Sequence, residues 1–315
     1  MTFSVDVVIP THENWELTES CLSHLRAQTI PHLAIVADNG SLDGTPELVR
    51  TEFPHARIVE TGGNLGFAVA CNRGVEAGQA EIVVLLNNDV ECRPDFLEKL
   101  VAPFEDERVG MVAAVLVRPG MEEIDSVGLT ADRTLAGYAR LQGRSVEEAA
   151  ATEPFLVGPS GGAAAYRRVA WEAAGGLDER IFIYSEDLDL ALRLRSAGWL
   201  AAVAPEAVGV HLGSATMGVR SSWQRRQGGF SRGYVLRRYG VFRSSAAVRA
   251  LATEAIVVTG DAVLSRDLSA LRGRVAGWRS AQGLPHRSSP PPESLDTSIG
   301  FWESLRLRRK SYEAS

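Results

Sequence analysis

The first hundred residues alternate short apolar runs with amphipathic segments, and this alternation is the feature that most constrains the fold. Apolar runs cover Val5–Pro10, Leu33–Ala37 and Ile82–Leu86. In the last of these, consecutive rather than alternate positions are apolar, which is typical of a parallel strand covered on both faces. The pattern therefore predicts a central sheet that is buried on both sides.

Helix signals lie between these runs. Leu17, Cys21 and Leu25 recur at helical spacing, and Thr45 followed by Pro46 is a typical helix start. The succession of strands and helices predicts a Rossmann-like α/β fold, with a mostly parallel central sheet and helices on both faces.

Later segments divide the chain further. Residues 119–155 are polar and without clear period, so we expect a hairpin and loops there, and the strand expected at Leu200–Val203 closes this part. Beyond Met217 the pattern is helical to about residue 281. We predict a first domain over 1–215, a basic helical C-terminal extension over 216–283, and a Pro/Ser-rich linker and basic tail over 284–315. The last fifteen residues are either a loose tail, which we favour, or a short amphipathic surface helix.

Charge is distributed unevenly along the chain. Residues 1–200 hold 31 acidic and 16 basic side chains, whereas residues 201–315 hold 8 acidic and 17 basic ones. This asymmetry indicates that the second part meets something anionic, such as a membrane surface or a phosphorylated acceptor.

The cysteines and the N-terminus indicate a compartment. The three cysteines have no metal-ligand spacing, which favours a reducing environment. The chain begins with a strand pattern, and it contains no apolar stretch of about 18 residues. We expect a cytoplasmic protein that is free or peripheral at the inner face of the plasma membrane.

Polar residues end two of the expected strands. Asn87, Asn88 and Asp89 follow a buried strand, and Asp38 ends another. Ligands of open α/β sheets bind at the carboxyl ends of the strands, so these side chains are candidates for a binding site. Taken alone, the Asn-Asn-Asp triplet is more typical of a solvated turn between a strand and a helix.

Three further candidates have ordinary structural alternatives. The glycines at 62–66 resemble a dinucleotide-binding loop, but the pattern is G-G-x-x-G and follows the third strand. Glu186 and Asp187 lie at an expected helix start with Ser185 as cap, where acidic residues simply complement the helix dipole. A lone histidine such as His211 is usually structural.

The order and spacing of seven segments resemble the family 2 glycosyltransferases with a GT-A fold, over roughly residues 4–215. The segments are VVIPT (Val7–Thr11), DNGSLDGT (Asp38–Thr45), NLGFAVACN (Asn64–Asn72), LLNNDV (Leu85–Val90), SGGAAAYRR (Ser160–Arg168), GGLDERIFIYSEDLDLALRLRSAGW (Gly175–Trp199) and His211.

This resemblance implies an inverting transfer of a sugar from a nucleotide diphosphate sugar to an acceptor hydroxyl, with Mg²⁺ or Mn²⁺ on the diphosphate. Asp187 matches the position of the family's general base, and Asp89 and His211 match metal ligands. The implied donor-binding residues are Thr11, Glu13, Asp38, Asn64, Asn72, Asn87, Asn88 and Asp89. The implied acceptor-binding residues are Gly161, Gly162, Tyr184 and Glu186.

The residue types suit this chemistry. A departing nucleoside diphosphate gains negative charge that a hard cation with oxygen ligands neutralises, and the acceptor hydroxyl needs a base on the opposite face of the sugar. The sequence departs from the family at Asn87, which replaces the first aspartate of its D-x-D motif and removes a charge from the metal site.

The C-terminal part combines arginines with aromatic residues. Between Arg220 and Arg243 there are seven arginines and no acidic residue, with Trp223, Phe230 and Tyr234 at helical spacing. Nothing there resembles a nucleic-acid module. We expect either a helix that packs its aromatic residues on the catalytic domain or a contact with an anionic membrane or an acceptor's pyrophosphate.

The leading hypothesis is a transferase that uses a deoxysugar such as L-rhamnose from dTDP-rhamnose and a glycan or polyprenyl-linked glycan acceptor. That donor and acceptor rest on a resemblance to bacterial rhamnosyltransferases of cell-envelope polysaccharide assembly. Two alternatives stay open at this point: a dinucleotide-dependent oxidoreductase that uses the loop at 62–66, and a non-catalytic glycan- or lipid-binding relative.

Overall fold

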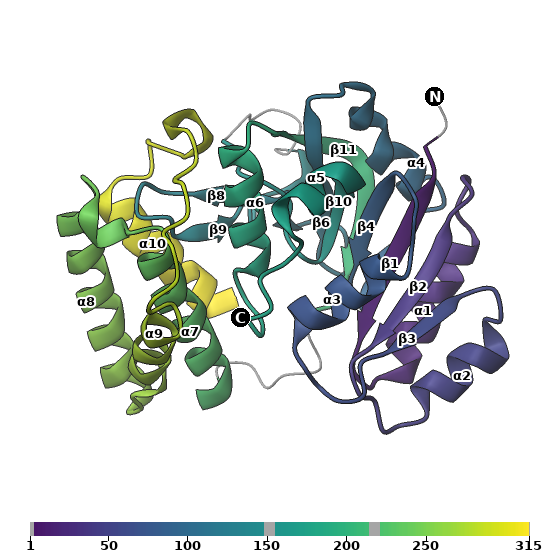
Figure 1. Cartoon of the computed structure of the whole chain (residues 1–315), viewed down its shortest axis with the longest axis horizontal. Coiled ribbons are helices and arrows are strands. Elements are labelled where there is room, and N and C mark those ends of the chain that lie inside the picture. Colours follow the sequence, from purple (N-terminus) through teal and green to yellow (C-terminus); the bar gives the residue numbers. More distant parts are fainter. Residues whose placement is uncertain (1–2, 148–154, 214–220, 315) are drawn as a thin grey trace.

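A computed structural model describes residues 3–147, 155–213 and 221–314 (Figure 1). Its main sheet has nine strands, in the order β3-β2-β1-β4-β10-β6-β11-β5, with β7 paired to β6. The strands are β1 (Val5–Thr11), β2 (Leu33–Asp38), β3 (Arg57–Glu60), β4 (Ile82–Leu86), β5 (Val90–Cys92), β6 (Val109–Val117), β7 (Ile124–Ser126), β10 (Ala163–Arg167) and β11 (Leu200–His211).

The sheet is mostly parallel, as predicted. Strands β1 to β4 run parallel to one another, and β6 runs parallel to β11. Strand β10 is antiparallel to both of its neighbours, β4 and β6. Strand β11 is longer than the strand predicted at Leu200–Val203, and His211 is its last residue.

Helices cover both faces of the sheet, because alternate strand residues point to opposite sides. Val8 and Ile35 belong to one core, and their strand neighbours Val7 and Val36 belong to the other. The first core is closed by α3 (Phe67–Glu76), α5 (Arg168–Ala174) and α6 (Glu186–Ser196), and the second by α1 (Trp15–Arg26), α2 (Thr45–Glu52) and α4 (Phe96–Val101).

Residues 119–147 contain the predicted hairpin. Strands β8 (Leu129–Ala131) and β9 (Gly137–Ala139) pair antiparallel to each other, while β7 joins the main sheet. Residues 148–154 of the segment predicted as hairpin and loops lie outside the described residues.

The C-terminal part forms a helical layer at one end of the molecule (Figure 1). It consists of α7 (Ser222–Arg238), α8 (Ala247–Ser265), α9 (Ser269–Ser280) and α10 (Phe301–Ala314). The helical extension is therefore confirmed, although Met217 and Arg220 lie outside the described residues. None of the described helices is long and apolar enough to cross a membrane.

Glycines allow α7 and α9 to pack backbone against backbone. A Cβ added at Gly233 would collide with the carbonyl of Arg274, and one added at Gly277 would collide with the carbonyl of Phe230. Small residues four apart let two helices approach this closely. Helices α7 and α9 therefore contact each other through main-chain atoms at these glycines.

Of the two alternatives for the last fifteen residues, the loose tail that we favoured is wrong, and a helix forms instead. Helix α10 covers Phe301–Ala314, and Ser304 is buried and donates a hydrogen bond to Asp132, 2.9 Å away. Before it, Arg287 forms ion pairs with the buried carboxylates of Asp178 and Asp189. These contacts fix the segment against the sheet-bearing region. The boundaries at 215 and 283 stay predictions.

Candidate active site

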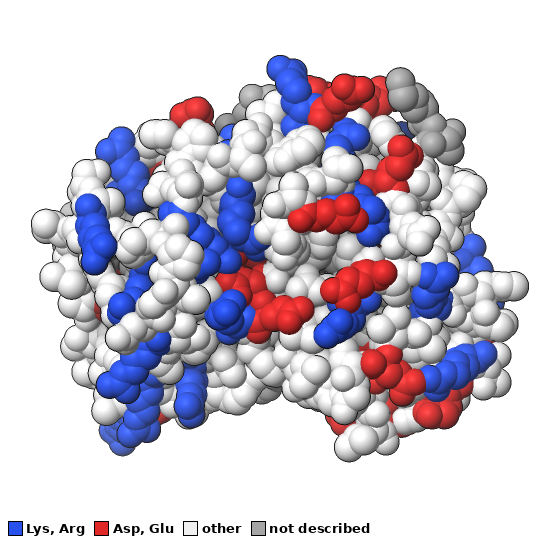
Figure 2. All heavy atoms as spheres, viewed as in Figure 1, with Lys and Arg blue, Asp and Glu red and all other residues white. Residues whose placement is uncertain are grey.

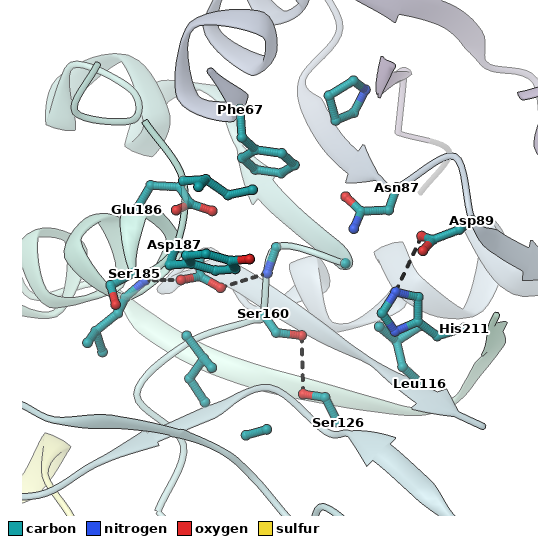
Figure 3. Close-up of a pocket in the computed structure, with 18 of the residues that line it drawn as sticks. Phe67, Asn87, Asp89, Leu116, Ser126, Ser160, Ser185, Glu186, Asp187 and His211 are labelled. Carbon is teal, nitrogen blue, oxygen red and sulfur yellow. Dashed lines mark hydrogen bonds and ion pairs between the residues drawn. The ribbon is translucent and has the colours of Figure 1, made fainter. Parts of the chain in front are cut away.

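A cavity of about 530 Å³ opens at the carboxyl ends of β1 and β4. Loops and helix starts from distant parts of the sequence enclose it (Figure 3). The residues implied by the family resemblance that line this cavity are Thr11, Asn64, Asn87, Asn88, Asp89, Gly161, Gly162, Tyr184, Glu186, Asp187 and His211.

The polar triplet after β4 forms one wall. The backbone N–H of Asn87 donates to Gly162, 3.0 Å away, which continues the ladder between β4 and β10. The amide of Asn88 donates to the hydroxyls of Thr11 and Thr18, at 3.0 and 3.1 Å. Asn88 therefore holds the wall together, whereas the buried Oδ1 of Asn87 has no hydrogen-bond partner among the described residues.

Asp89, His211 and Asp125 form a chain of contacts along the same wall. His211 Nε2 lies 3.3 Å from Asp89 Oδ1, and His211 Nδ1 lies 2.7 Å from Asp125 Oδ2. The contact to Asp89 lacks hydrogen-bond geometry, so that oxygen is buried without a hydrogen-bond partner in the described chain. Pairing of β5 with β11 brings the two metal candidates together, since His211 is opposite Val90.

The two carboxylates beside His211 favour its protonated, positively charged form. Burial alone would lower the pKa of His211, but its hydrogen bond to Asp125, its contact with Asp89 and the negative charges of both carboxylates raise that pKa to about 10. Burial acts to raise the pKa of Asp125, and its contacts with His211 nevertheless hold that pKa below its usual value. Two carboxylates thus surround one imidazole.

These residues fit a divalent cation that is shared with a ligand. The described residues contain no cluster of three or more acidic, histidine or cysteine side chains placed to hold a metal by themselves. Asp89 and His211 would supply two ligands, and Asn87 Oδ1 is a further oxygen in the same cavity that has no hydrogen-bond partner among the described residues. Mg²⁺ and similar ions are commonly held by one or two side chains together with phosphate oxygens.

Glu186 and Asp187 lie on the other side of the cavity from Asp89 and His211 (Figure 3). Asp187 accepts hydrogen bonds from the N–H of Gly161 at 2.8 Å and of Leu188 at 2.7 Å. Glu186 is buried, and its Oε2 has no hydrogen-bond partner among the described residues.

A strained turn positions this pair. Tyr184 and Ser185 have φ values of 70° and 64°, which are unusual for residues with a side chain. Ser185 occupies the N-cap position of α6, as predicted, but its side chain makes no capping bond. Such strain concentrates at functional sites because the surrounding structure must impose it.

The two carboxyls differ in how their charges are stabilised. Burial raises the pKa of Glu186 well above its usual value, and the charge of Asp187 raises it further. Burial also raises the pKa of Asp187, but its two backbone hydrogen bonds act in the opposite direction. Glu186 is therefore the better proton carrier and Asp187 the better carboxylate.

Three of the predicted residues do not line the cavity. Asp38 is paired with Thr11 in the sheet, accepts from the N–H groups of Gly40 and Ser41, and keeps a buried Oδ1 without a partner. Glu13 is exposed, at the turn before α1. Both remain at the sheet edge where the cavity opens.

Asn72 has a different position from the one expected. It is buried within α3, where its amide donates to the carbonyl of Leu177 and accepts from the Leu177 N–H, both at 2.9 Å. Its side chain therefore anchors the loop before the strained turn instead of facing the cavity.

Several residues line the cavity that were not predicted from the sequence, above all Asp125. It lies in β7, a strand of three residues within a polar stretch, which is too short for periodicity to reveal. His12, Phe67 and Ser160 also line the cavity. His12 directly follows a recognised motif, and Phe67 and Ser160 lie within two others, so their membership of or proximity to those motifs was the available signal.

A family model and a named relative both match this chain as a glycosyltransferase. The family model described as Glycosyl transferase family 2 matches residues 6–173. A protein of Mycobacterium tuberculosis named N-acetylglucosaminyl-diphospho-decaprenol L-rhamnosyltransferase is 32% identical over 235 residues, which cover 67% of this chain and 76% of that protein.

Two solved structures share the arrangement of elements. The mannosyltransferase PcManGT of Pyrobaculum calidifontis, solved with GDP-Man and Mn²⁺, has a TM-score of 0.57 at 21% identity, covering 100% of this chain and 87% of its own. GalNAc-T7, solved with UDP, GalNAc and Mn²⁺, has a TM-score of 0.62 at 14% identity, covering 98% of this chain and 58% of its own.

Proposed function

Because this chain belongs to glycosyltransferase family 2 and has the GT-A fold, we propose that it is an inverting enzyme that transfers L-rhamnose from dTDP-rhamnose to a hydroxyl of a polyprenyl-linked glycan. The observation that carries the mechanism is the placement of Asp187 and Asp89 on opposite sides of one cavity. The proposed sugar and acceptor rest on the rhamnosyltransferase relative.

Asp187 acts as the general base in this proposal. Its two backbone hydrogen bonds hold the carboxylate in a fixed orientation and stabilise its charge in a buried setting. The acceptor hydroxyl gives its proton to Asp187 as its oxygen forms the bond to the anomeric carbon. The nucleoside diphosphate leaves from the opposite face, so the configuration inverts.

Glu186 has the complementary role of a neutral acid that orients the acceptor. It has no backbone N–H donor to stabilise a negative charge at Oε2, and it lies next to Asp187. A protonated carboxyl donates a hydrogen bond, so Glu186 is suited to an acceptor oxygen. Tyr184, Gly161 and Gly162 form the cavity surface beside it.

The donor lies on the opposite wall. Asp89 and His211 would hold Mg²⁺ or Mn²⁺, which, when bound, neutralises the charge that develops on the departing diphosphate. Asp125 accepts from Nδ1 of His211 and so fixes the ring with Nε2 toward Asp89, where a metal ion would replace the Nε2 proton. The free Oδ1 of Asp38 faces the base or ribose in this proposal, with Thr11 beside it.

Donor class is tested by binding. We expect calorimetry with dTDP, UDP, GDP and NAD, each with and without Mn²⁺, to show dTDP binding that strengthens with metal and is lost in Asp89→Ala. Strong binding of a different nucleoside diphosphate would replace the proposed donor. Binding of NAD alone would favour the oxidoreductase alternative, which the family membership does not support.

Chemistry is tested at the base. We expect Asp187→Asn to lower kcat by about 10²–10⁴-fold while donor binding stays within about twofold, because it removes the proton acceptor and retains the shape. Glu186→Gln keeps a hydrogen-bond donor, and we expect it to retain more activity. Transfer that survives in Asp187→Asn would contradict the proposed base, and donor binding without any transfer would indicate a non-catalytic relative.

The pH profile gives a further check. Asp187 must be ionised to accept a proton, and burial raises its pKa. Activity should therefore fall on the acid side as the pH drops through that raised pKa, at a higher pH than for an ordinary aspartate.

A further inference from the structure

Helix α8 has its charged residues on the inside. Its 19 residues include only Arg249, Glu254 and Asp261 as charged side chains. Glu254 is buried and forms ion pairs with Arg232 at 2.7 Å. Arg249 reaches Asp132 at 3.0 Å, and Asp261 lies 3.8 Å from Arg225. All three therefore point toward the rest of the protein.

The outward face of α8 is apolar. Side chains on the surface of a water-exposed helix are normally polar, and an apolar stripe normally faces the core. Here the order is reversed, and the most exposed large apolar side chains of the helix are Val248 at 83%, Leu251 at 63%, Val263 at 70% and Leu264 at 78%.

The apolar surface continues onto the neighbouring helices. Leu268, at the N-cap of α9, and Leu271, in its first turn, are exposed. Trp302 in the first turn of α10 is 78% exposed, and it is near the start of α8 because Arg249 donates to the carbonyls of Ile299 and Gly300. Exposed large apolar side chains that gather on α8 and on the two helices in contact with it mark an interaction site.

Positive charge surrounds this surface. Arg266, Arg272 and Arg279 are exposed and have no carboxylate partner among the described residues. The acidic residues of 247–280 do not offset them, since Asp267 also pairs with Arg225, at 2.7 Å. In Figure 2, blue side chains predominate over the end of the molecule that carries the C-terminal helices.

We propose that the outer face of α8, together with Leu268, Leu271 and Trp302, docks on an anionic phospholipid bilayer. An amphipathic surface of this type lies in the interface plane, with its apolar residues in the headgroup boundary and its cations against anionic lipids. Trp302 suits that boundary because an indole is apolar with one polar group. The helix lies on the membrane without crossing it.

A second copy of this chain is a poorer occupant for the same face. A two-fold contact uses the same patch on both subunits, so it would bring two sets of unpaired arginines into one interface. Anionic lipid neutralises those arginines instead. Charge complementarity thus selects the bilayer over self-association.

The proposal stands on this surface alone and goes beyond the proposed reaction. It would place an enzyme with a lipid-linked acceptor at the membrane, but the docking face contains none of the cavity residues. Docking and transfer can therefore be tested separately.

The experiment is vesicle flotation with matched variants. The wild-type chain is mixed with vesicles of phosphatidylcholine alone or with 30 mol% phosphatidylglycerol. Val263→Glu tests the docking face, and Val169→Glu on α5 is the control, because that valine is also on a helix and 59% exposed. A double variant, Arg266→Gln with Arg272→Gln, tests the charge.

We expect binding to the anionic vesicles, a loss of at least about tenfold in Val263→Glu, and no change in Val169→Glu. Added salt should weaken the binding of the wild type to anionic vesicles. The double variant Arg266→Gln with Arg272→Gln should also bind these vesicles more weakly than the wild type does. Equal thermal midpoints for the variants would show that folding is intact. The proposal is overturned if the wild type does not bind, if Val263→Glu binds as well as Val169→Glu, or if α8 instead mediates dimers in ultracentrifugation.

Discussion

The sheet-bearing region and the C-terminal helical layer differ in where they place charged and apolar side chains. In the sheet, whole strands such as β4 and β6 are buried and apolar, and polar groups are concentrated where strands end. In the helical layer, Glu254 is buried among Arg232, Arg274 and Arg308, while valines and leucines face outward. The first arrangement builds a site at a rim, and the second leaves an apolar outer surface.

Helix packing differs in the same way. Helices α3 and α6 cover the sheet with apolar side chains such as Val75 and Leu190. Helices α7 and α9 meet through glycines, with main chain against main chain. Apolar side chains such as Val235 and Leu236 join the helical layer to one core of the sheet-bearing region, and within the layer close backbone contacts and buried ion pairs add to its stability.

Replacing Glu254 is the strongest test of that difference. Removing one partner of a buried ionic cluster leaves uncompensated charges, so we expect Glu254→Ala to lower the free energy of unfolding by about 3–5 kcal/mol in urea denaturation. The control is Glu47→Ala, whose ion pair with Arg50 is exposed; we expect less than about 0.5 kcal/mol there. If Glu254→Ala lowered the free energy of unfolding no more than Glu47→Ala does, the buried ionic cluster would not be stabilising.

The same variant shows whether the two regions unfold together. All three cysteines are buried in the sheet-bearing region, and burial raises the pKa of Cys21 to about 12. Their labelling by a thiol reagent therefore reports unfolding of that region only. We expect Glu254→Ala to increase the labelling rate, because Tyr239 and Arg287 tie the helical layer to Asp189. An unchanged rate would show independent unfolding.

The pH dependence follows from the same cluster. Burial alone would raise the pKa of Glu254, but the three arginines hold it well below its usual value. A lowered folded-state pKa stabilises the fold above the unfolded value of about 4.3, and this stabilisation is lost as the pH falls further. We expect the wild type to lose stability below about pH 4, and Glu254→Gln to show a flatter curve.

Alanine substitutions at two glycines are expected to change the stability of the protein by smaller amounts and in opposite directions. We expect Gly277→Ala to destabilise the protein by about 1–3 kcal/mol, because its Cβ would collide with the carbonyl of Phe230 and force α7 and α9 apart. Gly260→Ala in α8 meets no atom within 4 Å, and we expect it to stabilise by up to about 1 kcal/mol. Thermal unfolding of both variants measures the contrast, and destabilisation by both would contradict it.

The sheet-bearing region could be predicted from the sequence because its signals are local. The apolar runs predict the strands, and polar residues at strand ends predict the rim with Asn87 and Asp89; Asp187, at a helix start, is assigned to the site only through the family resemblance, and it lines the same cavity. Parallel strand pairing then leaves little freedom: the register of β1 with β2 places Thr11 beside Asp38.

The remaining features depend on contacts between distant residues. Asp125 joins the site only because β7 pairs with β6, and its three residues carry no period. Asn72 lies in a recognised motif, but its amide is used by Leu177, more than 100 residues away. The tail folds as α10 because Ser304 and Arg308 find partners in Asp132 and Glu254, which composition does not reveal.

Asp125 also gives the last test, because it is the cavity residue whose role is entirely indirect. It orients His211 through a 2.7 Å hydrogen bond and does not reach the position of the donor in our proposal. Such partners typically change metal affinity by about 10–100-fold when replaced. We expect Asp125→Asn to weaken Mn²⁺ binding, measured by electron paramagnetic resonance with dTDP present, by about tenfold.

The control for Asp125→Asn is Ser160→Ala, which also lines the cavity but bonds to Ser126 instead of His211. We expect Mn²⁺ affinity in that variant to stay at the wild-type value. If both variants bind Mn²⁺ like the wild type, His211 is not a metal ligand, and its contacts with two carboxylates only stabilise the edge of the sheet. If Asp125→Asn alone is weakened, the short strand β7 is part of the metal site, and the sheet-bearing region uses a buried charged pair for function where the helical layer uses such pairs for stability.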